Sequence, residues 1–293
     1  MNLEELIYKR FSGSEGLIKH LAKFSGLPAV FSPEAPGDNQ EGWGGDHKPR
    51  YPRVEYNFDL QANEERKSNG TLTVSLLCQN TADIAPEAIE PEVKKCLRDV
   101  LIKPKGSAPY CFTWARTDAF SLKDKKDNLV IGCDIRFDIL EYPNQETTDP
   151  DPIMAANKYM KELWPESLVI GYDDMEEITE ATKERPVIYC RLTAIEKAQE
   201  TNTVAWMDGK IAVHILCPDA DVRLKMATAT ANRLSLDGEI IMLDHSPMFI
   251  KRLQANYKSD YLKDGQIFAT VHYGLLRYKA RGATIRNAGL SYS

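Results

Sequence analysis

The two halves of the chain repeat one pattern of turns and alternating strands. Residues 69–78 open with Asn-Gly, continue as alternating apolar and polar residues and end in Leu-Cys. Residues 208–217 open with Asp-Gly and do the same 139 positions later. Three further segments match in the same order, at offsets of 134 to 139. Few residues are identical, so the evidence is the shared order of turn, alternation and length. Such self-similarity indicates a tandem duplication of one domain.

Each copy is expected to run α-β-β-β-α-β-β. Apolar residues at helical spacing predict the helices, and alternation predicts the strands. The Asn-Gly and Asp-Gly pairs predict hairpin turns, which need positive φ angles. Pro91 is expected in a first helical turn, and Asp219 as an N-cap. The expected elements of the first copy are a helix over 14–24, strands over 28–31, 52–60 and 71–78, a helix over 90–102, and strands over 110–120 and 128–142; those of the second are a helix over 152–164, strands over 168–171, 186–194 and 209–217, a helix over 219–234, and strands over 248–258 and 266–278.

The predicted fold class is α/β (α+β), with two tandem copies of this domain. Each is an antiparallel sheet with its helices on one face, because such a sheet needs cover on one face only. The other face is then solvated or meets another domain or subunit. A length of 293 residues suits two domains. The expected bounds are 1–143 for the first copy, 144–152 for a polar, proline-rich linker, 153–280 for the second copy and 281–293 for a C-terminal tail.

Charge and cysteine usage narrow the function classes. The formal net charge is −6, whereas proteins that coat nucleic acid usually carry a basic surplus. The acidic, amphipathic start does not resemble a signal peptide, and no run approaches the roughly 20 apolar residues of a membrane span, so no membrane partner is expected. None of the six cysteines forms a CxxC pair. They are interpreted as reduced core thiols of a protein made in a cytoplasm: Cys78, Cys96, Cys111, Cys133, Cys190 and Cys217.

The sequence predicts no catalytic, cofactor or metal site, and therefore no enzyme. No Walker A loop, G-x-S-x-G elbow or G-x-G-x-x-G fingerprint is present. The glycine-rich stretch 42–46 stands in a long loop without the helix N-terminus that a phosphate cradle needs. The acidic runs 64–65 and 173–177 are expected to be solvated. None of the five histidines lies in a metal-binding pattern, so each is expected to be satisfied locally or to face solvent: His20, His47, His214, His245 and His272.

Two segments are candidates for partner contact. The loop over 32–51 is long for a compact domain. An exposed Trp43 in it would be a partner-binding anchor; packing against its own domain is the alternative. The basic C-terminal residues lack apolar periodicity. They form either an arm that orders against a neighbour or a tail without function: Arg277, Lys279, Arg281 and Arg286.

The order of elements resembles that of the tail terminator, or tail completion, proteins of long-tailed bacteriophages. The resemblance rests on the final long hairpin and on the Pro-rich loop that runs from Val30-Phe31 to Tyr51-Pro52-Arg53-Val54. It covers nearly all of each copy and contains no catalytic motif. The doubled domain departs from the usual pattern.

The resemblance implies a virion protein of the tail–neck junction, assembled in the host cytoplasm. Six domains usually form the ring in that family, so three or six chains are expected here. Such a ring caps the tail tube or sheath and joins it to the head–tail connector or neck proteins. An acidic lumen is expected to let DNA pass without specific binding, since phosphate contacts need lysine and arginine. The alternatives are a neck or baseplate adaptor, a duplicated non-viral binding module that recognises nucleic acid or peptide, and an enzyme of unrecognised type.

Overall fold

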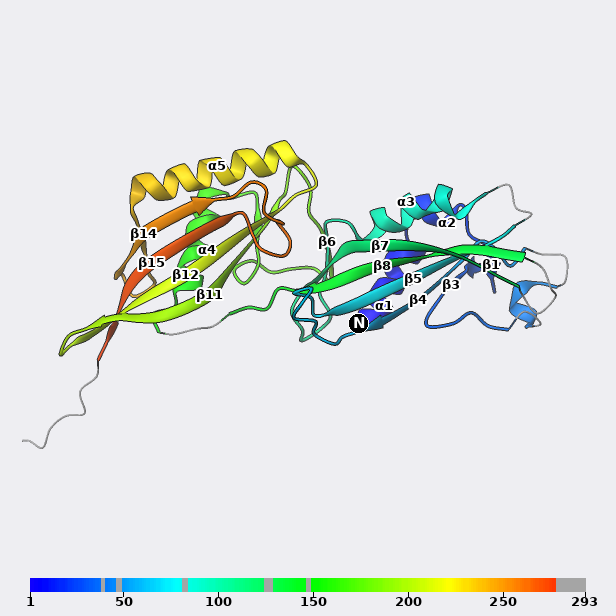
Figure 1. Cartoon of the computed structure of the whole chain (residues 1–293), viewed down its shortest axis with the longest axis horizontal. Helices are drawn as coiled ribbons and strands as arrows, with labels where there is room; N and C mark the ends of the chain where they lie inside the picture. The colour runs from blue at the N-terminus through cyan, green and yellow to red at the C-terminus, as the bar shows by residue number, and fades with distance from the viewer. Residues whose placement is uncertain (38–39, 46–48, 81–83, 124–128, 146–148, 278–293) are drawn as a thin grey trace, which may run out of the picture.

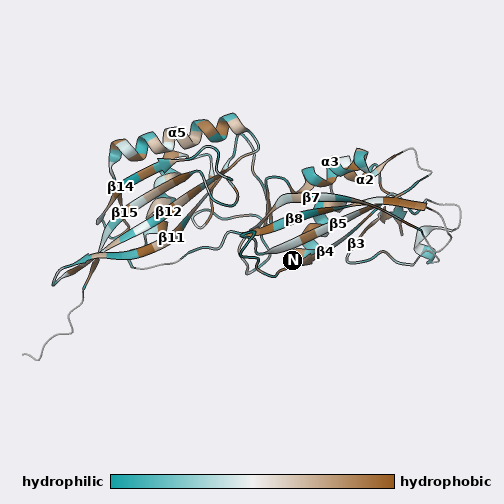
Figure 2. Ribbon diagram, viewed as in Figure 1, coloured by the Kyte–Doolittle hydropathy of each residue, from teal (hydrophilic) through white to brown (hydrophobic). Residues whose placement is uncertain are grey.

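The computed structural model contains two large β-sheets, which lie end to end along the longest axis of the molecule (Figure 1). Helices cover one face of each sheet, and the predicted mixed α+β class is confirmed. In both halves, brown and teal alternate along the strands because one face of each sheet is buried (Figure 2). The structure describes residues 1–37, 40–45, 49–80, 84–123, 129–145 and 149–277.

The first sheet has seven strands in the order β10-β6-β7-β8-β5-β4-β3. All neighbours are antiparallel except β3 and β4, which are parallel. Three helices close its apolar core, and a small two-stranded hairpin and a 3-10 turn lie beside it. The elements are α1 (Leu3–Ser12), α2 (Glu15–Ile18), β1 (Lys23–Phe24), β2 (Leu27–Pro28), β3 (Val30–Phe31), η1 (Glu41–Trp43), β4 (Arg53–Asp59), β5 (Gly70–Gln79), α3 (Pro86–Leu97), β6 (Val100–Ile102), β7 (Tyr110–Lys123), β8 (Leu129–Glu141) and β10 (Ile178–Glu180).

The second sheet has six strands in the order β13-β14-β15-β12-β11-β9. Its only parallel neighbours among the described strands are β9 and β11. Two helices cover its apolar face, and the long β11–β12 hairpin projects at the far end of the molecule (Figure 1). The elements are α4 (Pro152–Leu163), β9 (Leu168–Val169), β11 (Val187–Glu200), β12 (Val204–Leu216), α5 (Ala220–Asp237), β13 (Glu239–Ile241), β14 (Pro247–Ala255) and β15 (Ile267–Leu276).

The two sheets correspond strand by strand. Reading each from the same edge, β6-β7-β8-β5-β4-β3 takes the same places as β13-β14-β15-β12-β11-β9, and the parallel pair closes both. The chain visits these places in the same order in both halves. The first sheet has one strand more. That strand, β10, comes from the second half, from the segment between β9 and β11.

The Asp-Gly turn prediction is wrong. Asp208 and Gly209 lie in the middle of β12, where Gly209 pairs with Ile195 on one side and Val271 on the other. Its φ is not positive. The β11–β12 hairpin instead turns at 201–203. A Cβ on Gly209 would lie 3.2 Å from Leu192 and 3.3 Å from Val271, so the glycine accommodates packed neighbours and makes no turn.

The Asn-Gly prediction is also wrong, because Gly70 is the first residue of β5. A Cβ on Gly70 would lie 2.2 Å from the carbonyl oxygen of Asp59, so this position lies directly against the backbone of β4. Its φ is also not positive. A loop of ten residues, 60–69, connects β4 to β5. Turn chemistry alone therefore misplaced both hairpin turns, since pairing and packing decided where the strands began.

The first helix lies earlier than predicted. The Asn2 side chain accepts a hydrogen bond from the Glu5 amide at 2.8 Å, and the Glu5 carboxylate accepts one from the Asn2 amide at 3.1 Å, which forms a capping box. The predicted helix over 14–24 is broken after α2, where Ser25 and Gly26 take φ values of 49° and 83° and make the turn of the β1–β2 hairpin.

The later helices match the predictions more closely, but the predicted helix over 90–102 ends at Leu97, and residues 100–102 form β6. A short strand, β13, likewise follows α5, so both halves have a strand at this point that the predicted order lacks. Pro86, and not Pro91, starts α3, and Pro91 lies inside it. Asp219 caps α5 as predicted, accepting from the amides of Asp221 and Val222. The polar linker ends in a cap as well, since the Asp151 side chain accepts from the first amides of α4.

Candidate functional site

The two halves meet in a buried apolar cluster to which both contribute. The first half supplies residues from β6, β7 and β8, and the second supplies residues from β9, β11, β12 and the loop before β15. We call this set the junction cluster. Its buried members are Leu101, Cys111, Leu140, Tyr142, Leu168, Ile170, Ala181, Val187, Tyr189, Leu216 and Leu262. Burial of this kind makes the two halves one packed unit, since separating them would expose the cluster to water.

Strand β10 ties the halves together through the backbone. It pairs antiparallel with β6 over its full length. Backbone hydrogen bonds extend the ladder at both ends: the Lys103 amide donates to the Glu177 carbonyl at 2.8 Å, and the Ala181 amide donates to the Asp99 carbonyl at 2.9 Å. An ion pair between Arg10 and Glu180, at 3.0 Å, reinforces the same edge. The second half thereby completes the first sheet.

Polar groups at the junction are also paired across the two halves. The Tyr261 hydroxyl donates to Asp99 at 2.7 Å, and the Tyr142 hydroxyl donates to the Leu262 carbonyl at 2.9 Å. Lys263 donates to Asp138 at 2.8 Å. Burial raises the pKa of Tyr261, and the neighbouring Asp99 carboxylate raises it further, so the phenol keeps the proton that it donates.

His214 is buried at the junction, only 1% exposed, with its ring against those of Tyr142 and Tyr189. Its Nδ1 lies 2.9 Å from the Tyr261 carbonyl oxygen. Burial, with a smaller effect of Arg191, lowers the pKa of His214 to about 4. The imidazole is therefore neutral near pH 7, and Nδ1–H donates to the carbonyl. The prediction of a histidine with satisfied hydrogen bonds therefore holds for Nδ1 alone, since Nε2 is buried without a hydrogen-bond partner among the described residues.

A groove of about 570 Å³ opens beside the junction. Half-exposed Trp114 lines it, and the Lys94 ammonium lies 3.8 Å from the centre of the indole ring. Burial acts to raise the pKa of Glu90, but hydrogen bonds from Lys94 and Thr117 outweigh it, so the carboxyl stays ionised and holds Lys94. The lining combines apolar side chains with three basic and two acidic ones. The remaining lining residues are Arg98, Asp99, Phe112, Thr113, Phe137, Lys258, Asp260, Tyr261 and Leu262.

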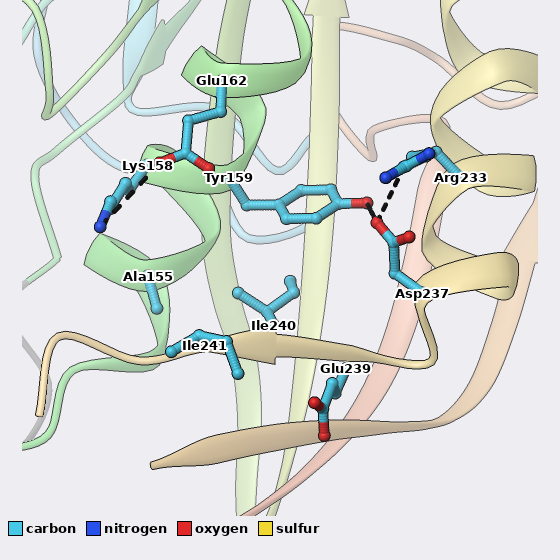
Figure 3. A pocket seen from close by; sticks show the side chains of 9 residues that line it. All are labelled: Ala155, Lys158, Tyr159, Glu162, Arg233, Asp237, Glu239, Ile240 and Ile241. Atoms are coloured by element: carbon cyan, nitrogen blue, oxygen red, sulfur yellow. Dashed lines mark hydrogen bonds and ion pairs between the residues drawn. The ribbon is translucent and has the colours of Figure 1, made fainter. Parts of the chain in front are cut away.

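A second cleft, of about 360 Å³, lies between α4, the end of α5 and β13 (Figure 3). Tyr159 reaches across it and donates to Asp237 at 2.8 Å, and Arg233 pairs with the same carboxylate at 2.9 Å. Burial and the bond to Asp237 raise the pKa of Tyr159. Glu239 and Ile241 of β13 border the cleft. The contacts of Tyr159 and Arg233 with Asp237 thus tie α4 to the end of α5 across the cleft.

A polar constellation lies on the helix-free face of the second sheet. Asp208 receives hydrogen bonds from Lys251 at 2.9 Å and from His272 at 2.6 Å. The bond from Lys251 is the largest influence that lowers the pKa of Asp208. Trp206 stacks on His272 with ring centres 4.9 Å apart. The Asp208 carboxylate thus accepts from two donors, as is usual for a charged group on a solvated sheet face.

Trp43 is not the exposed anchor that the sequence raised as one possibility. Its side chain is 1% exposed and packs edge-on against Phe24 and Phe31, with ring centres 5.1 and 5.7 Å away. The alternative, packing against its own domain, is confirmed. Ala22 and Ala29 belong to the same buried cluster, so Trp43 attaches the long loop to the rest of its domain.

Of the basic C-terminal candidates, Arg277 lies within the described residues. It pairs with Glu200 at 3.1 Å and donates to the Thr201 carbonyl at 3.2 Å, at the tip of the β11–β12 hairpin. Both of these contacts of Arg277 are thus with residues of the second half. Lys279, Arg281 and Arg286 lie outside the described residues, as does the predicted tail 281–293.

All six cysteines are buried, as predicted. Burial raises the pKa of Cys190 to about 12, so its thiol stays protonated. Within the described ranges, no group of three or more histidine, cysteine or acidic side chains is arranged to hold a metal ion. No helix of the described chain is long and apolar enough to cross a membrane.

Sequence reasoning missed the junction. The sequence predicts a solvated connection over 173–177, yet Glu177 and the next three residues bind the first sheet. Three residues of β10 are too few for periodicity to reveal a strand. One signal in the sequence was usable: Leu101 and Cys111 are apolar, yet the alternation along their strands places both on the sheet face opposite the helices.

The comparisons with known proteins returned nothing: no protein-family model, no curated protein and no solved structure matches the chain.

Proposed function

We propose that this protein is a structural component of a virion, a tail terminator that caps the tail tube or sheath of a long-tailed bacteriophage and joins it to the neck. The observation that carries the proposal is the duplication itself. Two domains with one strand order are fixed to each other by a shared apolar cluster and a shared sheet. A rigid pair of equivalent domains is a natural unit for a ring, because rings form when head-to-tail contacts close.

The outward face of the first sheet supports a passive role toward DNA. Arginines on this face lie beside carboxylates: Arg53 pairs with Glu55 at 2.9 Å, and Arg116 and Arg136 share Asp118, at 3.0 and 3.5 Å. Paired arginines attract phosphate less than free ones. A lumen lined in this way would let DNA pass without specific binding, in a ring of three or six chains at the tail–neck junction.

The test is to add the purified protein to isolated tail tubes and image them by negative staining. We expect density with a central hole at one tube end, and joining of capped tubes to heads that carry their neck proteins. Tubes that remain bare at saturating protein would refute the proposal. Binding along the tube or at the baseplate end would instead favour the adaptor alternative.

One observation favours a second candidate, a duplicated non-viral binding module. The groove beside the junction places an exposed indole and a cationic rim over apolar walls. A peptide with an aromatic or acidic side chain would fit this chemistry. Peptide-array binding that is lost in Trp114→Ala, with no capping of tubes, would select this candidate over the first.

A further inference from the structure

The segment before β10 presents its side chains in alternation. Tyr172, Asp174 and Glu176 are exposed, whereas Asp173 and Met175 between them are half-buried. Tyr172 is 47% exposed. We call residues 172–176 the acidic segment. It offers solvent one aromatic side chain and two carboxylates.

The half-buried residues of the acidic segment anchor it to the second half. The Asp173 carboxylate accepts from the Val169 amide at 2.8 Å and from Lys161 at 2.9 Å. Met175 packs against the junction cluster. The two exposed carboxylates, by contrast, have no ion-pair partner among the described residues. The acidic segment is therefore held in place with its charges unmatched.

The groove beside the junction has the opposite imbalance. Its two carboxylates are already engaged: Asp99 accepts from the Tyr261 hydroxyl at 2.7 Å, and Asp260 accepts from two backbone amides of its own turn, at 2.9 and 3.2 Å. Lys258 is exposed and has no ion pair among the described residues. Arg98 is 70% exposed, with only a loose contact to Asp99 at 3.4 Å. The groove therefore favours an anionic occupant.

The aromatic wall of the groove is fixed before anything binds. Trp114 is 50% exposed, yet the Lys94 ammonium lies 3.8 Å from the centre of its ring and its Nε1–H donates to Thr117 at 3.0 Å. An exposed side chain that is already ordered loses little conformational entropy on binding. Rigid aromatic side chains of this kind are frequent anchors of protein interfaces.

The two surfaces lie beyond opposite ends of the β6–β10 ladder. At one end the Lys103 amide donates to Glu177, which directly follows the acidic segment. At the other end the Ala181 amide donates to Asp99, which lines the groove. The anchored segment of one chain is thus directed away from the groove of the same chain.

We infer that the acidic segment of one chain binds in the groove of a second copy, with Tyr172 against Trp114 and the two exposed carboxylates toward Lys258. The inference rests on the proposed assembly function and names the contact through which chains would join. Unmatched anions meet unmatched cations, and an exposed phenol meets an exposed indole. Because the two surfaces differ, the contact is head-to-tail, which is the kind that closes a ring.

The first experiment measures the mass of the full chain by light scattering across a wide range of concentration. We expect wild type to exceed the single-chain mass of 33.1 kDa increasingly with concentration. Asp174→Lys/Glu176→Lys should raise the concentration needed for assembly by at least about tenfold, because it sets cations against cations. Glu64→Lys/Glu65→Lys is the matched control, since this exposed acidic pair lies in the loop between β4 and β5. It should assemble like wild type, and thermal melts establish that both variants are folded.

A second variant tests the groove. Lys258→Glu is expected to weaken assembly in the same way. An equimolar mixture of Lys258→Glu with Asp174→Lys/Glu176→Lys should assemble again, because a segment that carries lysines then faces a groove that carries a glutamate, and a wild-type segment faces a wild-type groove. A folding defect in either variant cannot produce this rescue.

The third experiment identifies the contact. A photoreactive benzoylphenylalanine replaces Tyr172, and equal amounts of isotopically light and heavy protein are mixed before irradiation. We expect mixed-isotope crosslinks to peptides that contain Trp114 or Lys258. Three results would overturn the inference: a single-chain mass for wild type at every concentration, undiminished assembly of Asp174→Lys/Glu176→Lys, or crosslinks to a different surface.

These results are distinguishable from those of the tube experiment. Assembly through the groove without capping of tubes would leave the inference standing and remove the tail terminator. Capping of tubes by Asp174→Lys/Glu176→Lys, with wild-type stoichiometry, would remove the inference and leave the proposed function.

Discussion

The hydroxyl of Tyr261, in the second half, donates a 2.7 Å hydrogen bond to the carboxylate of Asp99, in the first. Asp99 has a φ of 56° and a side chain that is 2% exposed, and it directly precedes β6. A buried carboxylate needs such a donor, because its desolvation is costly when it is unpaired. The bond therefore fixes the position of the second half against the turn that begins β6.

Removing this donor is expected to destabilise the whole chain. Tyr261→Phe should lower the free energy of unfolding by about 1.5–3 kcal/mol, the usual range for a hydrogen bond to a charged group. Urea denaturation measures the change. Tyr257→Phe is the control, because Tyr257 is 52% exposed, and its loss should stay within about 0.5 kcal/mol. Equal effects of the two substitutions would contradict the role given to the Asp99 bond.

Truncating the junction cluster is expected to loosen the half that is not mutated. Leu101→Ala removes a fully buried side chain of the first half and should cost about 2–5 kcal/mol. Native-state hydrogen exchange should show faster exchange in β9 and β11, across the junction. Ile139→Ala, inside the core of the first half alone, is the control. Unchanged exchange in the second half of Leu101→Ala would mean that the halves are energetically independent.

The lowered pKa of His214 predicts a stability that depends on pH. The folded-state pKa is about 4 and the ordinary value is 6.5, so the unfolded chain binds more protons between these two values. The stabilisation is complete above about pH 6.5 and is lost as the pH falls toward 4. A shift of this size corresponds to on the order of 3 kcal/mol.

Subtracting the unfolding free energies of His214→Gln from those of wild type, measured from pH 7 to pH 4, isolates this contribution from the carboxylates that titrate in the same range. We expect the difference to decline across the window. A difference that stays constant with pH would show that His214 is not the group responsible.

The Trp43 cluster predicts opposite outcomes for two glycines of one loop. A Cβ on Gly42 would lie 2.4 Å from the Phe24 ring, whereas a Cβ on Gly37 would meet nothing within 4 Å. Gly42→Ala should therefore cost about 1–3 kcal/mol by overpacking, and Gly37→Ala close to nothing. Thermal unfolding compares them. A neutral Gly42→Ala would show that Phe24 yields without cost.

The sequence predicted the duplication and most long strands, because alternation over many residues reports a sheet with one buried face. It located α4 and α5 closely, where an aspartate caps each helix. It failed where local chemistry was overruled by packing. Asp208-Gly209 has the composition of a turn, yet the strand formers Val204 and Trp206 precede it and extend β12.

The contact surfaces could not be predicted because they depend on residues distant in sequence. Asp99 and Tyr261 are separated by 162 positions, and no periodicity connects them. Trp43 left two interpretations open for a similar reason. Its burial depends on Phe24 and Phe31, which become neighbours only when β1 and β3 are in place.

Covalent linkage of the two halves changes the kinetics of any ring that is built from this chain. One contact of each pair forms within a single molecule, at the high effective concentration that a short connection imposes. Only the alternate contacts require collisions between molecules, so closure of a ring proceeds through fewer than half the bimolecular steps that the same number of single domains would need. Dilution and competing partners can then act on the contact between chains, while the contact inside each chain is already made.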